Sequence, residues 1–286
     1  MSWDWADNIA QQLSSQGLMQ TGICLILGAA DTGKTTLATA LAQHLAQRQP
    51  VGIIDADIGQ SHIGPPTTVG WAVVDKPQLD FSQLAPAGIS FVGHVTPVGH
   101  LLQLTAAIVQ GADQLSKVTD LVIIDTPGLI KGSAAAALWW AVQQILKPRL
   151  ILAVQRQDEL SGILCGLKSF DLQLEKIESP PQMAIKSLQV RQAYRKKQFI
   201  SYFRHARPYN ISLADVAVQP GRDLSRESFI NRLIALRNKE GIDVALAVIT
   251  GWQQSGKVIV VKAPPLEISQ ICCLIIGDIT IDIPDQ

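Results

Sequence analysis

The stretch LILGAADTGKTTLATAL, residues 25–41, decides the fold of this chain. From Gly28 to Thr35 it matches G-x-x-x-x-G-K-[ST], a loop whose backbone N–H groups cradle phosphates at the start of a helix. The apolar residues before the loop are typical of a buried parallel strand. After it, Leu37 and Leu41 recur at the spacing of an amphipathic helix. Because this strand–loop–helix order is the context that the motif requires, the sequence predicts a binding site for a nucleoside triphosphate.

Each residue type in the loop has a physical role. The two glycines permit backbone conformations and a close approach that a side chain would block. Lys34 is expected to reach the β- and γ-phosphates, and the Thr35 hydroxyl is expected to bind Mg²⁺. The residues expected to hold the nucleotide are Gly28, Asp31, Thr32, Gly33, Lys34, Thr35 and Thr36.

Aspartates follow two other apolar runs. GIIDADIGQ carries Asp55 and Asp57, and LVIIDTPG carries Asp125. The carboxyl ends of parallel strands meet at the edge where ligands bind. If the first strand persists to Asp57, both of its aspartates face one side. Carboxylates there would hold metal-bound water, as expected of Asp55 and Asp125, or accept a proton from an attacking hydroxyl. The alternative for each aspartate is that it caps the following turn.

Apolar strands alternate with helical segments as far as about residue 178, which predicts an α/β fold. We expect a P-loop NTPase-type, mainly parallel sheet flanked by helices, with residues 58–70 as a Gly/Pro-rich loop. Short β-rich runs then predict a small C-terminal β-rich module. The expected domains are a helical lead-in (1–20), a P-loop domain (21–210) that includes a basic lid segment (186–207), and the module (211–286).

The composition indicates a globular chain, with 286 residues, 47% hydrophobic and 17% charged. Its formal net charge is zero, so any basic surface for nucleic acid must be local. The four cysteines form no CxxC pair, which argues against a metal or redox role. The sequence shows neither a signal peptide nor an apolar run of about 18 residues, and we expect a soluble, cytoplasmic protein without a membrane partner.

Between Glu178 and Asp215 the chain has no acidic residue and seven basic ones. This segment is open to three interpretations. It is a solvated helix with a basic face, or it binds nucleic acid with help from interleaved aromatic residues such as Tyr194. Alternatively, it supplies a lid whose arginines stabilise charge on a transferred phosphoryl group. Arg191 and Arg195 are four residues apart and therefore share one helical face.

Two other nucleotide-binding classes fit less well. The DTPG turn is typical of GTPases, but the N-K-x-D tetrapeptide that reads guanine is missing, since the only Asn-Lys is followed by Glu240 and Gly241. DADIGQS is similar to a segment of partitioning and metal-insertion ATPases. Those proteins commonly carry an additional lysine early in the phosphate loop, where this chain has Gly28-Ala-Ala-Asp.

The ordered set of motifs resembles the P-loop polynucleotide 5′-hydroxyl kinases, which act in pre-mRNA cleavage, tRNA splicing and pre-rRNA processing. The resemblance covers about residues 20–286. It is carried, in the family's order, by GAADTGKTTL, DADIGQSHIGPPTTVG, FVGHVTPVGH, LVIIDTPGLIKG, RQAYRKKQFISYF and the C-terminal β-rich runs.

The resemblance implies transfer of the γ-phosphate of ATP, with Mg²⁺, to the 5′-hydroxyl end of a polynucleotide, RNA more than DNA. It places Lys34 at the phosphates and Asp57 at the carboxylate that activates the hydroxyl. Arg191 and Arg195 become catalytic lid residues. The residues that it assigns to substrate binding are Gln60, Thr96, His100 and Lys131.

The sequence departs from the family at three places. Leu129 stands where several members have tryptophan, and His100 replaces the usual asparagine. Only about 20 residues precede the first predicted strand, and we expect a short form that lacks the N-terminal β domain of larger members. The alternative function is a nucleotide-dependent regulatory or scaffold ATPase or GTPase that binds a protein partner without phosphorylating nucleic acid.

Overall fold

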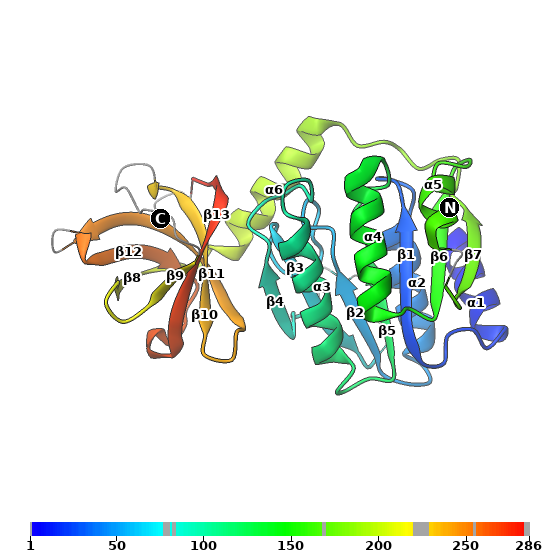
Figure 1. The fold of residues 1–286 in the computed structure, drawn as a ribbon, viewed down its shortest axis with the longest axis horizontal. Coiled ribbons are helices and arrows are strands. Elements are labelled where there is room, and N and C mark those ends of the chain that lie inside the picture. Colours follow the sequence, from blue (N-terminus) through cyan, green and yellow to red (C-terminus); the bar gives the residue numbers. More distant parts are fainter. Residues whose placement is uncertain are drawn as a thin grey trace.

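The structure is a computed structural model that describes residues 2–76, 81, 84–167, 170–219, 229–253 and 256–282. Figure 1 shows an α/β body beside a smaller β module, with helix α6 (Leu188–Tyr202) between them. The expected α/β class is thus confirmed, including the β-rich C-terminal part.

Five parallel strands form the centre of the α/β body. In spatial order they are β7 (Gln173–Glu178), β6 (Leu150–Gln155), β1 (Gly22–Gly28), β5 (Leu121–Asp125) and β2 (Val51–Asp55). β2, β5 and β6 are buried along their whole length. Their nearly continuous apolar sequences fit strands that are covered on both faces. All five carboxyl ends lie at one edge of the sheet, where the phosphate loop begins.

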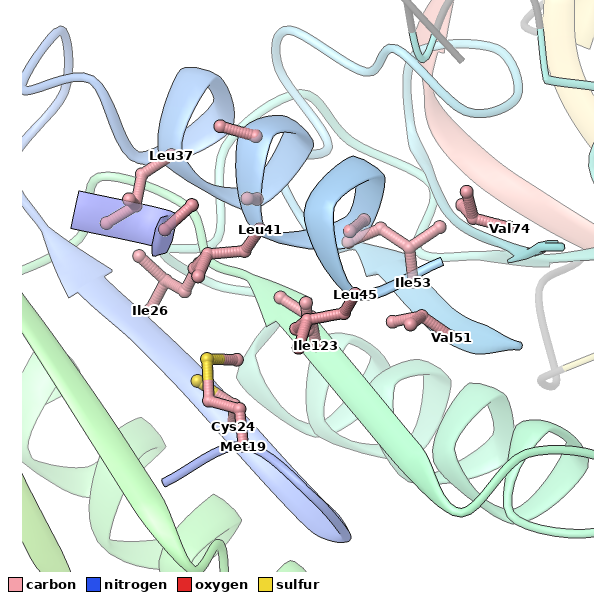
Figure 2. Close-up of a cluster of buried hydrophobic side chains, with 14 of the residues drawn as sticks. Met19, Cys24, Ile26, Leu37, Leu41, Leu45, Val51, Ile53, Val74 and Ile123 are labelled. Atoms are coloured by element: carbon pink, nitrogen blue, oxygen red, sulfur yellow. The ribbon is translucent and has the colours of Figure 1, made fainter. Parts of the chain in front are cut away.

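Helices cover both faces of this sheet (Figure 1). One face carries α1 (Ser2–Ser15) and α2 (Lys34–Leu45), and the other carries α3 (Leu101–Leu115) and α4 (Gly132–Leu146), while α5 (Ser161–Leu167) follows β6. In Figure 2, Leu37 and Leu41 of α2 lie by Ile26 of the sheet, and Leu45 lies by Ile123. The amphipathic helix predicted after the phosphate loop therefore packs as its spacing indicates.

An antiparallel hairpin interrupts the parallel order, and this differs from the predicted loop over 58–70. β3 (Thr68–Val74) begins inside that range and pairs antiparallel with β2, and β4 (Gly88–Phe91) pairs antiparallel with β3. The Gly/Pro-rich composition predicts a loop and not a strand. Gly70 nevertheless lies within β3, where the packing of the preceding loop requires a glycine. A Cβ at Gly70 would lie 1.9 Å from the Ile63 carbonyl oxygen, because the preceding loop folds back over β3.

The C-terminal module is built mainly from antiparallel strands. They are β8 (Arg207–Ser212), β9 (Ala217–Gln219), β10 (Arg232–Asn238), β11 (Asp243–Gln253), β12 (Val258–Ala263) and β13 (Ile271–Thr280), with a 3₁₀ turn at Ile268–Gln270. A separate apolar cluster, which includes Ile234, Ile259 and Leu274, fills the module. The expected boundary after residue 210 falls inside β8, which pairs with β12.

The module joins the α/β body at β4 and at the end of α6. Ile89 of β4 pairs with Asp243 of β11, and the Asp243 carboxylate accepts a hydrogen bond from the Phe91 N–H at 2.7 Å. Phe203, directly after α6, is buried among residues of both parts. Within the described residues, no helix combines the length and apolar character that crossing a membrane requires.

Candidate active site

The phosphate loop connects β1 to α2 at the carboxyl edge of the sheet. Gly33 directly precedes α2 with φ of 95°, in the left-handed region that glycine adopts readily. At Gly28 a Cβ would lie 2.5 Å from the Val154 carbonyl oxygen and 2.8 Å from Thr32 Oγ1, so a side chain does not fit. The two glycines of the motif are thus explained by the geometry of the loop.

Lys34 is buried and turns back over the loop. Its Nζ donates to the Ala29 carbonyl at 2.7 Å. Burial lowers the pKa of Lys34, whereas the nearby carboxylate of Asp125 acts in the opposite direction. This ammonium group therefore lies inside the loop, where a bound phosphate would offer it a stronger acceptor.

Thr35 and Asp125 meet at the same edge. The Thr35 hydroxyl donates to Asp125 Oδ2 at 2.6 Å. Asp125 Oδ1 is buried and has no hydrogen-bond partner within the described residues. A hydroxyl and a carboxylate with a buried, unpaired oxygen suit a hard cation such as Mg²⁺. Across the described ranges, no group of three or more His, Cys, Asp or Glu side chains could hold a metal alone. A magnesium ion would therefore depend on the phosphates of the nucleotide for further ligands.

Asp55 organises the loop that follows β2. Its carboxylate accepts backbone hydrogen bonds from Asp57 at 3.1 Å, His62 at 2.5 Å and Ile63 at 3.1 Å. Burial raises the pKa of Asp55, and the backbone bond from His62 opposes this shift. Burial also raises the pKa of Asp125, its neighbour in the β2–β5 register, against the charge of Lys34. These contacts match the turn-capping alternative for Asp55, whose metal role stays a prediction.

Asp57 lies beyond the end of β2, so strand periodicity does not set its direction. Its Oδ1 accepts N–H bonds from Gly59 and Gln60, both at 3.1 Å. Asp57 lines a cavity of about 240 Å³ together with Lys34, Thr35 and other loop residues. The turn thus places the Asp57 carboxylate at the cavity. The sequence predicts the same location, but from the periodicity of a longer strand.

The segment that leads into helix α6 lines this cavity with Met183, Ala184 and Lys186. Arg191 Nη2 is 2.5 Å from Asp31 Oδ2 in the phosphate loop. Lys186 Nζ donates to Gln60 Oε1 at 3.1 Å, and the Tyr194 hydroxyl donates to the Ser61 carbonyl at 2.8 Å. The basic segment is therefore tied to both the phosphate loop and the loop after β2.

Arg195 lies one helical turn beyond Arg191. Burial and the charge of Arg191 lower its pKa, whereas the charge of Asp57 raises it. The contacts of Arg195 with the nucleotide remain a prediction. Arg191 and Lys186 thus bring positive charge to Asp31 of the phosphate loop and to Gln60 of the loop after β2.

The remaining predicted substrate residues lie outside the lining of this cavity. The Thr96 N–H donates to His94 Nδ1 at 3.1 Å. His100 stacks on His94, and its Nε2 is 2.9 Å from Asp278 Oδ2 of β13. Lys131 is exposed and immediately precedes α4. Their contacts with substrate remain predictions.

Sequence reasoning missed two residues that support the phosphate loop. Arg156 and Ser179 hold the carbonyls of Asp31 and Thr32, at 2.5 and 2.9 Å. Arg156 directly follows β6, and Ser179 directly follows β7. The rule that ligands bind at the carboxyl ends of parallel strands, which pointed to Asp125, would therefore have found both residues. Lys186 and Tyr194 belong to the predicted basic segment, and the contacts that the structure adds for them are with the loop after β2.

The sequence pattern of a family described as "mRNA cleavage and polyadenylation factor CLP1 P-loop" matches residues 28–205. The chain belongs to this family. The matched range contains the phosphate loop, both aspartate-bearing segments and α6. The similarity to the CLP1 P-loop family therefore extends over the whole candidate site.

Relatives in the CLP1 P-loop family extend the similarity. A polyribonucleotide 5′-hydroxyl-kinase of Pyrococcus abyssi is 34% identical over 204 residues, which span 71% of this chain and 56% of the relative. A polyribonucleotide 5′-hydroxyl-kinase of Pyrococcus furiosus is 31% identical over 255 residues, spanning 86% of this chain and 68% of the relative. The chain thus covers little more than half of the first of these relatives.

A solved structure of wild-type Clp1p in complex with Pcf11p superimposes with a TM-score of 0.70, covering 96% of this chain and 77% of that chain. The two sequences are 13% identical, so this likeness shows the shared fold. It includes the α/β body and most of the C-terminal module.

Proposed function

We propose that this chain transfers the γ-phosphate of ATP to the 5′-hydroxyl end of a polynucleotide, with RNA preferred over DNA. The observation that carries the proposal is that Lys34 and Asp57 line one cavity, and that Arg191 of α6 forms an ion pair with Asp31 in the lining of that cavity. A phosphate-binding cation, a candidate base and a lid arginine are the groups that phosphoryl transfer requires. The names of the curated relatives support the same activity.

In the proposed reaction, the 5′-oxygen attacks the γ-phosphorus and forms a new P–O bond. The bond from that phosphorus to the β-bridging oxygen breaks, and ADP leaves with the electron pair. Asp57 accepts the proton of the hydroxyl, for which its Oδ2 is suited, since Oδ1 already accepts from Gly59 and Gln60. Lys34 and a lid arginine, Arg191 or Arg195, stabilise the negative charge on the transferred group.

Thr35 and Asp125 would hold the magnesium ion, which neutralises charge on the β- and γ-phosphates. The unpaired Oδ1 of Asp125 supports this assignment. Asp55 would hold the loop that carries Asp57 in position, because its carboxylate oxygens accept hydrogen bonds from three backbone N–H groups of that loop.

The acceptor end would enter beside Gln60, which lines the cavity and accepts from Lys186. Thr96, His100 and Lys131 would contact the polynucleotide farther from the reacting atoms. Leu129 cannot stack on a terminal base as the tryptophan of several family members can, so we expect weaker discrimination at that base.

Transfer of labelled γ-phosphate from ATP to 5′-hydroxyl oligonucleotides, RNA and DNA in parallel, tests the proposal. We expect label on RNA, less on DNA, and none with Lys34→Ala. ATP hydrolysis alone, or nucleotide binding without turnover, would instead support the rival function, a regulatory or scaffold protein. Wild-type transfer by Lys34→Ala would contradict the assigned site.

A further inference from the structure

The first turn of α1 lies at the phosphate loop. Trp5 Nε1 donates to the Glu178 carbonyl at 3.1 Å, and a Cβ on Gly33 would lie 3.2 Å from the Trp5 ring. Farther along, Ala6, Ala10 and Leu13 are buried in the cluster that contains the apolar face of α2. α1 therefore runs beside α2, with both helices starting at the loop.

Trp3 extends the buried stripe of α1 toward the cavity. It precedes Ala6 by three residues, so it lies on the same helical face. Trp3 is nevertheless 44% exposed, and it lines the cavity that contains the phosphate loop. An indole ring at a cavity wall, beyond the part of the stripe that packs in the core, is available to a ligand.

The residues that line the cavity include two chemically different sets. Asp57, Gln60 and Lys186 line it with charged and polar groups on the side of the acceptor loop. Thr36 and Thr39 follow the magnesium-site residue Thr35 along α2, and they line the cavity together with Trp3, Met183 and Ala184. This second set carries no charge and includes an aromatic face, which suits an aromatic base better than a phosphate.

We propose that Trp3 is the stacking platform for the base of the nucleoside triphosphate held by the phosphate loop. The inference deepens the proposed function and rests on its nucleotide site, but it does not depend on phosphate transfer. The loop fixes the triphosphate near Lys34, so the nucleoside must extend away from it, and the uncharged set of lining residues offers it a complementary surface. Because every base offers a π-face, Trp3 binds ATP and GTP to a similar extent.

Equilibrium binding of ATP, GTP and inorganic tripolyphosphate, each with Mg²⁺ and measured by calorimetry, tests the platform. We expect Trp3→Ala to weaken ATP and GTP binding by about tenfold and to leave tripolyphosphate binding unchanged. Trp3→Phe should keep most of the affinity. The matched control is Trp140→Ala, because Trp140 is 48% exposed on α4 and contacts Phe170 edge-on, away from the cavity lining.

Two results would overturn the inference. Unchanged ATP affinity in Trp3→Ala would show that the base does not contact the ring. An equal loss of ATP and tripolyphosphate binding would assign Trp3 to the structure of the loop. The proposed kinase is tested separately, because a base-dependent loss of affinity without any phosphate transfer supports the platform and contradicts the kinase.

Discussion

Arg191 and Asp31 form an ion pair, at 2.5 Å, between α6 and the phosphate loop. Asp31 is 5% exposed and Arg191 is 22% exposed, so solvent screens this pair less than a surface pair. Asp31 also accepts a hydrogen bond from the Lys186 N–H at 3.0 Å. The same aspartate thus fixes both the start of the basic segment and its first arginine over the triphosphate site.

A double-mutant cycle tests this contact. We expect Asp31→Asn and Arg191→Ala each to slow phosphate transfer about tenfold, because each loses the contact that positions the lid arginine. The double variant should be no slower than Arg191→Ala alone, which corresponds to a coupling of about 1.4 kcal/mol. Rate losses that multiply in the double variant would show that the two residues act independently.

The Thr35–Asp125 contact predicts a change in the magnesium requirement. Asp125→Asn removes the negative charge beside Thr35 and should raise the Mg²⁺ concentration for half-maximal transfer by roughly tenfold or more. Titration of Mg²⁺ at saturating ATP measures this. Asp113→Asn, at an exposed position on α3, serves as the control. An unchanged requirement in Asp125→Asn would remove Asp125 from the magnesium site.

The buried carboxylates predict how stability depends on pH without magnesium. Burial raises the pKa of Asp55 and of Asp125 above the ordinary 3.8. Above pH of about 4, the folded protein then binds more protons than the unfolded chain, so the free energy of unfolding falls as pH rises toward neutrality. Urea denaturation at several pH values in EDTA measures the slope. Asp125→Asn should reduce it, and an unchanged slope would show that Asp125 does not titrate in this range.

Much of the fold follows from local sequence. The phosphate loop, the four parallel strands β1, β2, β5 and β6, and the amphipathic helix α2 each have a pattern within one short segment, whereas β7 is mostly polar and has none. β3 was missed because its first residues, Thr68 to Gly70, have the composition of a turn, and only pairing with β2 makes them a strand. The preceding loop over Gly70 is a tertiary feature with no local signal.

The candidate site shows the same difference between features that local sequence predicts and features that depend on tertiary packing. The sequence brought Asp57 to the site through strand periodicity, but β2 ends at Asp55 and a turn directs Asp57 instead. His100 was expected at the substrate, yet its nearest ionic partner is Asp278, distant in sequence and located in the C-terminal module. Such a contact depends on how the C-terminal module packs on the α/β body. No pattern within a short segment of the sequence indicates that packing.

Asp243 links the module to the α/β body and predicts a large stability effect. Its buried carboxylate pairs with Arg237 at 2.7 Å and accepts from the Phe91 N–H. Asp243→Ala leaves both groups without their partner and should lower the free energy of unfolding by about 3 kcal/mol. Asp113→Ala, which breaks the exposed pair with Lys117, should change it by less than about 0.5 kcal/mol. Chemical denaturation compares the two, and equal effects would contradict the buried pair.

The most direct test of the account is single-turnover phosphate transfer to 5′-hydroxyl RNA by Asp57→Asn, measured together with ATP binding. The amide keeps the shape and the bonds that Oδ1 accepts, but it cannot accept the proton of the attacking hydroxyl. We predict a loss in transfer rate of about 100-fold or more, with the dissociation constant for ATP changed by no more than about twofold. Transfer at the wild-type rate, or the loss of ATP binding, would contradict the assignment of Asp57 as the base.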